Sequence, residues 1–76
     1  MKKLDEQTLK AFHIACDNLG ISMTDEEIQR AYNDESDDTV EILYNCEGVS
    51  YACVTHGEAL ASVNIATLEL DEPEDE

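Results

Sequence analysis

Positive charge is scarce in this sequence and is confined to its start. The chain has four Lys and Arg residues against 19 Asp and Glu residues, a formal net charge of −15, and no Lys or Arg follows Arg30. Such a chain repels phosphates, so direct binding to nucleic acid or to an anionic membrane surface is not expected. A basic protein is the natural partner, and the most strongly cationic protein surfaces are those that bind nucleic acid.

Sequence patterns of common catalytic and cofactor sites are also missing. The chain has no Gly-rich phosphate loop, no Cys-x-x-Cys pair and no His-Glu-x-x-His segment, and it contains only two His. Residues 34–39 are rich in acids but lack the central Gly of a calcium-binding loop. Carboxylates surrounded by like charges and water stay ionised rather than acting as catalytic acids. We therefore expect no enzyme activity, no cofactor and no bound metal.

The chain shows no pattern typical of membrane insertion or secretion. No apolar run is long enough to cross a bilayer, and the first residues do not form a secretory signal. Three cysteines, Cys16, Cys46 and Cys53, are an odd number without a close pair. We expect them to be free, buried thiols in the cytoplasm of a host cell. With 76 residues, the chain should form one domain over residues 1–70, followed by an acidic tail over 71–76.

The first helix is predicted from Leu4 to Leu19. Asp5 is a suitable N-cap, and Gly20 is placed where a left-handed residue ends a helix. Apolar residues recur at spacings of three and four along this segment, which is typical of an amphipathic helix. The predicted inward stripe consists of Leu9, Phe12, Cys16 and Leu19.

The second helix is predicted from about Asp25 to Tyr32. Thr24 and Glu27 fit the capping box, in which each side chain accepts a hydrogen bond from the backbone amide of the other. Ile28 is expected to point inward. The following segment, residues 34–38, has no apolar residue and is expected to be a solvated or protein-binding loop.

A β-hairpin is predicted from Val40–Tyr44 and Val49–Thr55. Its turn, residues 45–48, begins with Asn and ends with Gly, which supplies the positive φ that a bulged hairpin requires. This turn would pair Ile42 with Ala52. The register follows from the turn because each strand alternates between two faces.

Residues 58–70 allow more than one interpretation. Val63, Ile65 and Leu68 favour a third strand from about Ser62 to Leu70, with room for a helical turn before it. A full helix over this segment is the alternative.

The predicted order is therefore ααβββ. Helices followed by strands indicate an α+β fold, with two helices packed on one face of a three-stranded antiparallel sheet. The core predicted for this arrangement consists of Leu9, Phe12, Ile28, Val40, Ile42 and Val54.

The acidic residues could together present the charge pattern of a nucleic acid. Duplex DNA carries one charge per ~1.7 Å of axis, and the Arg and Lys side chains that hold phosphates also hold carboxylates. The sequence therefore predicts a DNA-mimicking inhibitor that blocks the nucleic-acid-binding groove of a basic protein. Tyr44 or Tyr51 would add an apolar anchor. The residues expected to replace phosphates are Glu27, Asp34, Glu35, Asp37, Asp38, Glu41 and Glu47.

One segment resembles a known family of such inhibitors. Residues 21–28, Ile-Ser-Met-Thr-Asp-Glu-Glu-Ile, look like the link and second-helix start of phage uracil-DNA glycosylase inhibitors. Residues 35–37 and the predicted hairpin over 40–55 follow in a similar order, and the size and acidity are also similar. The wider class of small phage DNA mimics, including anti-CRISPR and anti-restriction proteins, is equally compatible.

The resemblance implies specific contacts with a host defence or repair protein. Glu27 matches an acid of the family's second helix, whereas the family's acid-Ser pair before that helix is replaced here by Leu19-Gly20. The family also shelters an apolar residue of its target between helix and sheet. The residues that could form such a pocket here are Met23, Ile28 and Tyr32.

A second hypothesis is a small adaptor or antitoxin-like module that binds a basic protein away from any nucleic-acid site. The apolar face of the first helix, including Ile14, would then make most of the contact, and salt would affect binding less. A homodimer formed through the edge of the third strand is compatible with both hypotheses.

Overall fold

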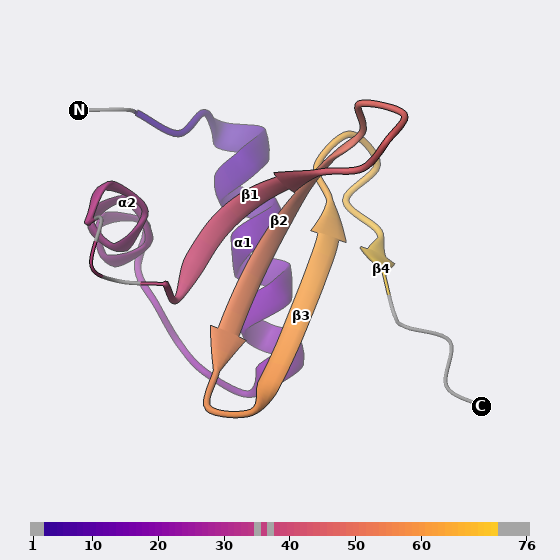
Figure 1. Ribbon diagram of the computed structural model, residues 1–76. Coiled ribbons are helices and arrows are strands. Elements are labelled where there is room, and N and C mark those ends of the chain that lie inside the picture. Colours follow the sequence, from indigo (N-terminus) through magenta and orange to yellow (C-terminus); the bar gives the residue numbers. More distant parts are fainter. Residues whose placement is uncertain (1–2, 35, 37, 72–76) are drawn as a thin grey trace.

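The computed structural model describes residues 3–34, 36 and 38–71 and shows an α+β fold (Figure 1). Within these residues, two helices precede four antiparallel strands, which form one sheet in the order β1-β2-β3-β4. The sheet has one strand more than the sequence predicted. The elements are α1 (Glu6–Leu19), α2 (Asp25–Asn33), β1 (Val40–Tyr44), β2 (Ser50–His56), β3 (Ala59–Asn64) and β4 (Leu70–Asp71).

The ends of α1 follow the predicted capping chemistry, although the helix starts at Glu6 rather than Leu4. The Asp5 carboxylate accepts a hydrogen bond from the Thr8 amide at 2.8 Å. Hydrogen bonds from the Thr8 side chain and amide lower the pKa of Asp5, so the cap is an ionised carboxylate. At the other end Gly20 adopts φ +76°, which Gly takes without strain, and its amide donates to carbonyls of the last turn.

The buried face of α1 is rotated from the predicted stripe. Ala11 and Ala15 are fully buried beside Phe12, whereas Leu9 and Leu19 are only half-buried. The helix packs on β2 and β3, and small side chains at the centre of this contact allow close packing of backbone against backbone. Larger apolar residues therefore lie at the margins of the contact.

The start of α2 confirms the capping box and offers a stability test. The Glu27 amide donates to the Thr24 hydroxyl at 3.1 Å, and the Thr24 amide donates to Glu27 Oε1 at 2.9 Å. Thr24→Ala removes the first acceptor and should lower the free energy of unfolding by about 1 kcal/mol, measured by urea denaturation. Thr24→Ser keeps the hydroxyl and is the control. Equal losses in the two variants would contradict this role of the hydroxyl.

The β1–β2 hairpin has the predicted register. Ile42 pairs with Ala52, and the Asn45 amide donates to the Val49 carbonyl at 3.0 Å. The Asn45 side chain accepts hydrogen bonds from two amides of the turn, and Gly48 has φ +84°. Local turn chemistry thus fixes which residues of the hairpin face the core.

The predicted bounds of the third strand were wrong. β3 begins at Ala59 because Gly57, with φ +65°, and Glu58 form a two-residue turn that pairs His56 directly with Ala59. Residues 59–64 are extended throughout, so neither a helical turn before the strand nor a full helix occurs there.

The chain reverses again after β3, which explains the fourth strand. The Asn64 side chain accepts hydrogen bonds from the Ala66 and Thr67 amides, and Leu68 adopts φ +62°. Leu70–Asp71 then pairs with the end of β3. The strand edge considered for a homodimer is therefore covered at that end. The predicted acidic tail begins within β4, and its residues 72–76 lie outside the described part of the chain.

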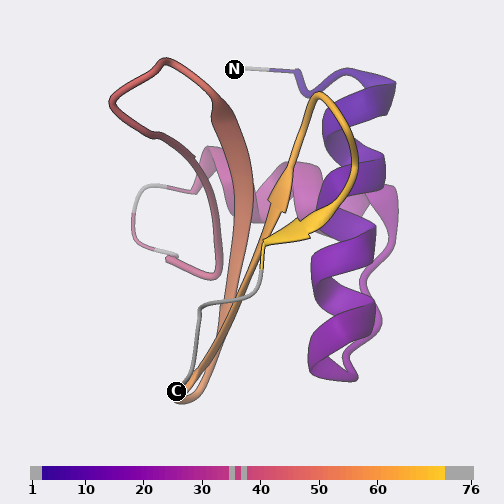
Figure 2. The ribbon, with the colours of Figure 1, turned by 90° about the vertical axis from the view of Figure 1, so that its right-hand side faces the viewer.

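The two helices take different positions against the sheet. α1 lies across β2 and β3 on one face, whereas α2 lies at the side of β1 and also contacts α1 (Figures 1 and 2). We predicted both helices on one face, and only α1 covers it. In the part of the chain that the structure describes, no helix is long and apolar enough to cross a membrane.

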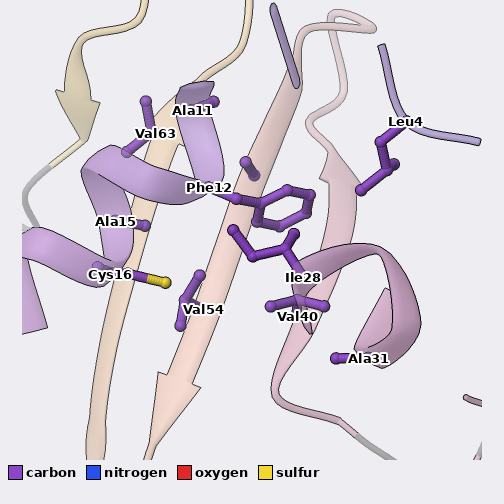
Figure 3. Packing of buried hydrophobic residues seen from close by; sticks show 12 residues of the cluster. Leu4, Ala11, Phe12, Ala15, Cys16, Ile28, Ala31, Val40, Val54 and Val63 are labelled. Carbon is purple, nitrogen blue, oxygen red and sulfur yellow. The ribbon is translucent and has the colours of Figure 1, made fainter. Parts of the chain in front are cut away.

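The core lies between α1, α2 and the face of the sheet that α1 covers. Figure 3 shows Phe12 pointing from α1 toward Ile28 of α2 and Val40 of β1. These three residues and Val54 are buried as predicted, whereas Leu9 and Ile42 are half-buried and pack against the cluster. The buried hydrophobic residues are Leu4, Ala11, Phe12, Ala15, Cys16, Ile28, Ala31, Val40, Ala52, Cys53, Val54, Ala61 and Val63.

Candidate protein-binding surface

Carboxylates without cationic partners dominate the surface. Every Asp and Glu side chain that the structure describes is exposed. Among the described residues, the one ion pair joins His13 Nε2 to Asp25 Oδ1 at 2.5 Å. Most of the negative charge is therefore uncompensated within the described chain and faces solvent.

Four of the predicted phosphate replacements lie around α2 and the start of β1. α2 contacts β1, and Asp34 and Asp38 lie in the connection between them, so the four acids come from neighbouring segments of the chain. Glu27 and Asp34 line one shallow hollow of about 310 Å³ together with Arg30. We call this set of four residues the acidic side: Glu27, Asp34, Asp38 and Glu41.

Two members of the acidic side also stabilise local structure. Glu27 completes the capping box, and Asp34 Oδ1 accepts hydrogen bonds from the Ser36 amide at 3.0 Å and from its hydroxyl at 2.7 Å. A carboxylate has about four acceptor positions, so both groups retain capacity for a partner. Asp38 and Glu41 take no part in a helix cap. Substitutions at Asp38 and Glu41 therefore test binding with little effect on folding.

The remaining predicted acids do not join the acidic side. Glu47 lies in the turn at the far end of β1, and this five-residue strand is about 17 Å long at ~3.4 Å per residue. Glu35 and Asp37 lie outside the residues that the structure describes. The structure thus assembles part of the predicted set and separates Glu47 from it.

The predicted tyrosine anchors lie on opposite faces of the sheet. Tyr44 shares the face of Ile42 by strand alternation but is 71% exposed at the end of β1. Tyr51 is half-buried on the other face. Two exposed leucines on that other face were missed, Leu43 at 49% and Leu60 at 61% exposure. Leu43 is out of phase with the inward residues of β1, and this alternation could have identified it.

The apolar contact sites suggested by the sequence are only partly formed. Ile28 is fully buried in the core, and the Tyr32 ring packs on Phe12 with a centroid distance of 6.4 Å. Met23 lines hollows that neither Ile28 nor Tyr32 reaches, so these three residues do not form one pocket. Ile14 is half-buried against the core and lines a hollow together with Met23.

The three cysteines differ in accessibility. Cys16 and Cys53 are buried, but Cys46 is exposed in the β1–β2 turn, so the expectation of three buried thiols was wrong for Cys46. Burial raises the pKa of the Cys16 thiol, which disfavours the reactive thiolate. Native protein should therefore react quickly with a thiol reagent at one site, Cys46, and at all three sites after denaturation. Cys46→Ser should abolish the fast phase, and a persistent fast phase would contradict this assignment.

Among the described residues, no three His, Cys, Asp or Glu side chains form a group that could hold a metal ion. The acid-rich segment 34–39 is described only at residues 34, 36, 38 and 39.

Comparison of the chain with protein-family models, with curated proteins and with solved structures found no match. No likeness to known proteins therefore adds to this geometry.

Proposed function

We propose that this chain is an inhibitor that occupies the nucleic-acid-binding groove of a basic protein and presents carboxylates in place of phosphates. The observation that supports this most is that the four carboxylates of the acidic side are exposed and form no ion pair with a described residue. Lys and Arg side chains of such a groove accept carboxylates through the same hydrogen bonds that they donate to phosphates. The class of target is a host defence or repair protein, as for inhibitors of phage or mobile-element type.

The dimensions of the acidic side suit this role. Glu27 in the first turn of α2 and Asp34 at its C-cap are seven residues apart, so a rise of ~1.5 Å per residue separates them by about 10 Å along the helix axis. Successive phosphates of one DNA strand rise by ~3.4 Å, so α2 covers the length of three to four phosphates. The whole molecule measures 37 × 26 × 20 Å, which allows it to enter a groove built for a duplex.

The proposal predicts competition with nucleic acid. A target captured from nuclease-treated host extract should release a labelled duplex when this chain is added. The inhibition constant should weaken steeply between low and high salt, because the attraction depends on screened charges. A ternary complex, in which the target holds this chain and the duplex together, would overturn the proposal.

A further inference from the structure

The face of the sheet opposite α1 carries apolar side chains among polar ones. By strand alternation and register, residues from all four strands form rows across this outer face. One row consists of Glu41, Cys53, Ser62 and Asp71; the row on one side of it consists of Leu43, Tyr51 and Asn64, and the row on the other side contains Thr55 and Leu60. We call this set of nine residues the outer face. An antiparallel sheet commonly exposes one face to solvent, and the side chains on that face are then mostly polar.

The centre of the outer face is hollowed and the ends of its central row are charged. A hollow of about 420 Å³ is lined by Leu43, Tyr51, Cys53 and Ser62, among others. Cys53 is buried, and its Sγ lies 3.3 Å from the Ser62 Oγ. Strands lie about 4.8 Å apart, so Glu41 and Asp71 are separated by about 14 Å across the sheet. The hollow thus has apolar walls at Leu43 and Tyr51, and a carboxylate lies at each end of the central row.

The charges on the outer face determine which kind of molecule can bind there. The outer face has no cation, since no Lys or Arg follows Arg30 in the sequence. A second copy of the chain would bring Glu41 and Asp71 against like charges, which disfavours a symmetric dimer on this face. An anionic membrane surface or a nucleic acid would be repelled for the same reason.

We infer that the outer face is a docking surface for a protein that presents one large apolar side chain between two Lys or Arg residues. The apolar side chain enters the hollow, and the flanking cations reach Glu41 and Asp71. This arrangement, a desolvated anchor inside a charged rim, is typical of strong protein interfaces. The inference rests on the proposed function because both require a cationic partner. Glu41 belongs to both the acidic side and the outer face, so the inference makes these two surfaces parts of one continuous contact area.

Two matched peptides test this inference by NMR titration of the isotope-labelled chain. The first is a lysine-rich peptide with a central Phe, and the second carries Gly in place of Phe. The Phe peptide should bind about tenfold more tightly, and its amide shifts should centre on Leu43, Tyr51 and Ser62, which line the hollow. Leu43→Ser should remove this difference and leave binding of the Gly peptide unchanged. Leu43 is 49% exposed, so the variant should remain folded.

The remaining outcomes separate the inference from the proposed function. Equal affinities for the two peptides, with shifts confined to α2 and the start of β1, would overturn the outer face as a docking surface and leave the acidic side as the contact. Absence of binding by either peptide at low salt would overturn both proposals. A dimer found by sedimentation that Leu60→Ser dissolves would show that a second copy occupies this face, and would overturn the inference alone.

Discussion

Replacing Phe12 by Ala is expected to remove a large part of the free energy that holds the chain folded. Phe12 is fully buried where α1, α2 and β1 meet, and Phe→Ala at such sites costs about 3–5 kcal/mol. A 76-residue domain has a total stability of about 4–11 kcal/mol at ~0.05–0.15 kcal/mol per residue. The loss is therefore a large part of the whole. Urea denaturation followed by circular dichroism should show a midpoint shifted far toward zero, or no folded baseline.

Tyr44→Ala is the matched control for this experiment. It also removes an aromatic ring, but from a side chain that is 71% exposed, so its effect should stay within about 0.5 kcal/mol. Both variants keep the net charge, so self-repulsion among the acids is the same in each. If Phe12→Ala unfolds at the same urea concentration as Tyr44→Ala, the packing of Phe12 does not hold the three elements together.

Features set by neighbouring residues could be predicted from the sequence. The caps at Asp5 and Thr24 depend on a side chain three residues or fewer from its backbone partner, and the structure confirms both. The turn that begins at Asn45 sets the β1–β2 register in the same local way. In each case the chemistry is complete within one turn of chain, so tertiary packing does not alter it.

Features set by packing could not be predicted in the same way. Hydrophobicity alone placed Leu9 and Leu19 at the two ends of the inward stripe of α1, but contact with the sheet buries the smaller Ala11 and Ala15 instead. The short β4 depends on its pairing with β3, which no local pattern requires. The earlier start of β3 is different, because the turn at Gly57 and Glu58 that sets it is local in the sequence.

The candidate surface was predicted in composition but not in arrangement. Counting acids after Arg30 gives only the sign of the surface charge, and the distance between Asp38 and Glu47 depends on β1 lying between them. The hollow on the outer face depends on strand pairing, so Leu43 of β1 and Tyr51 of β2 come to line it together only in the folded chain.

Reversing two charges of the acidic side should abolish inhibition. The double substitution Asp38→Lys with Glu41→Lys places cations where the target's groove is itself cationic. Like charges across an interface cost several kcal/mol, and each 1.4 kcal/mol is tenfold, so affinity should fall by about a hundredfold or more. The free energy of unfolding should hold or rise, because both side chains are exposed and the net negative charge is reduced. A competition assay at low salt measures the first effect, and urea denaturation measures the second.

Glu58→Lys with Glu69→Lys is the matched control for this charge reversal. It changes the net charge by the same amount at exposed positions in the β2–β3 turn and before β4, whereas α2 lies at the side of β1 (Figure 1). Long-range steering should weaken similarly in the two double variants, so both should bind more slowly. Only the variant with the acidic side reversed should also dissociate from the target faster. Equal losses of affinity in the two variants would show that net charge alone governs binding, and the acidic side would not be the contact surface.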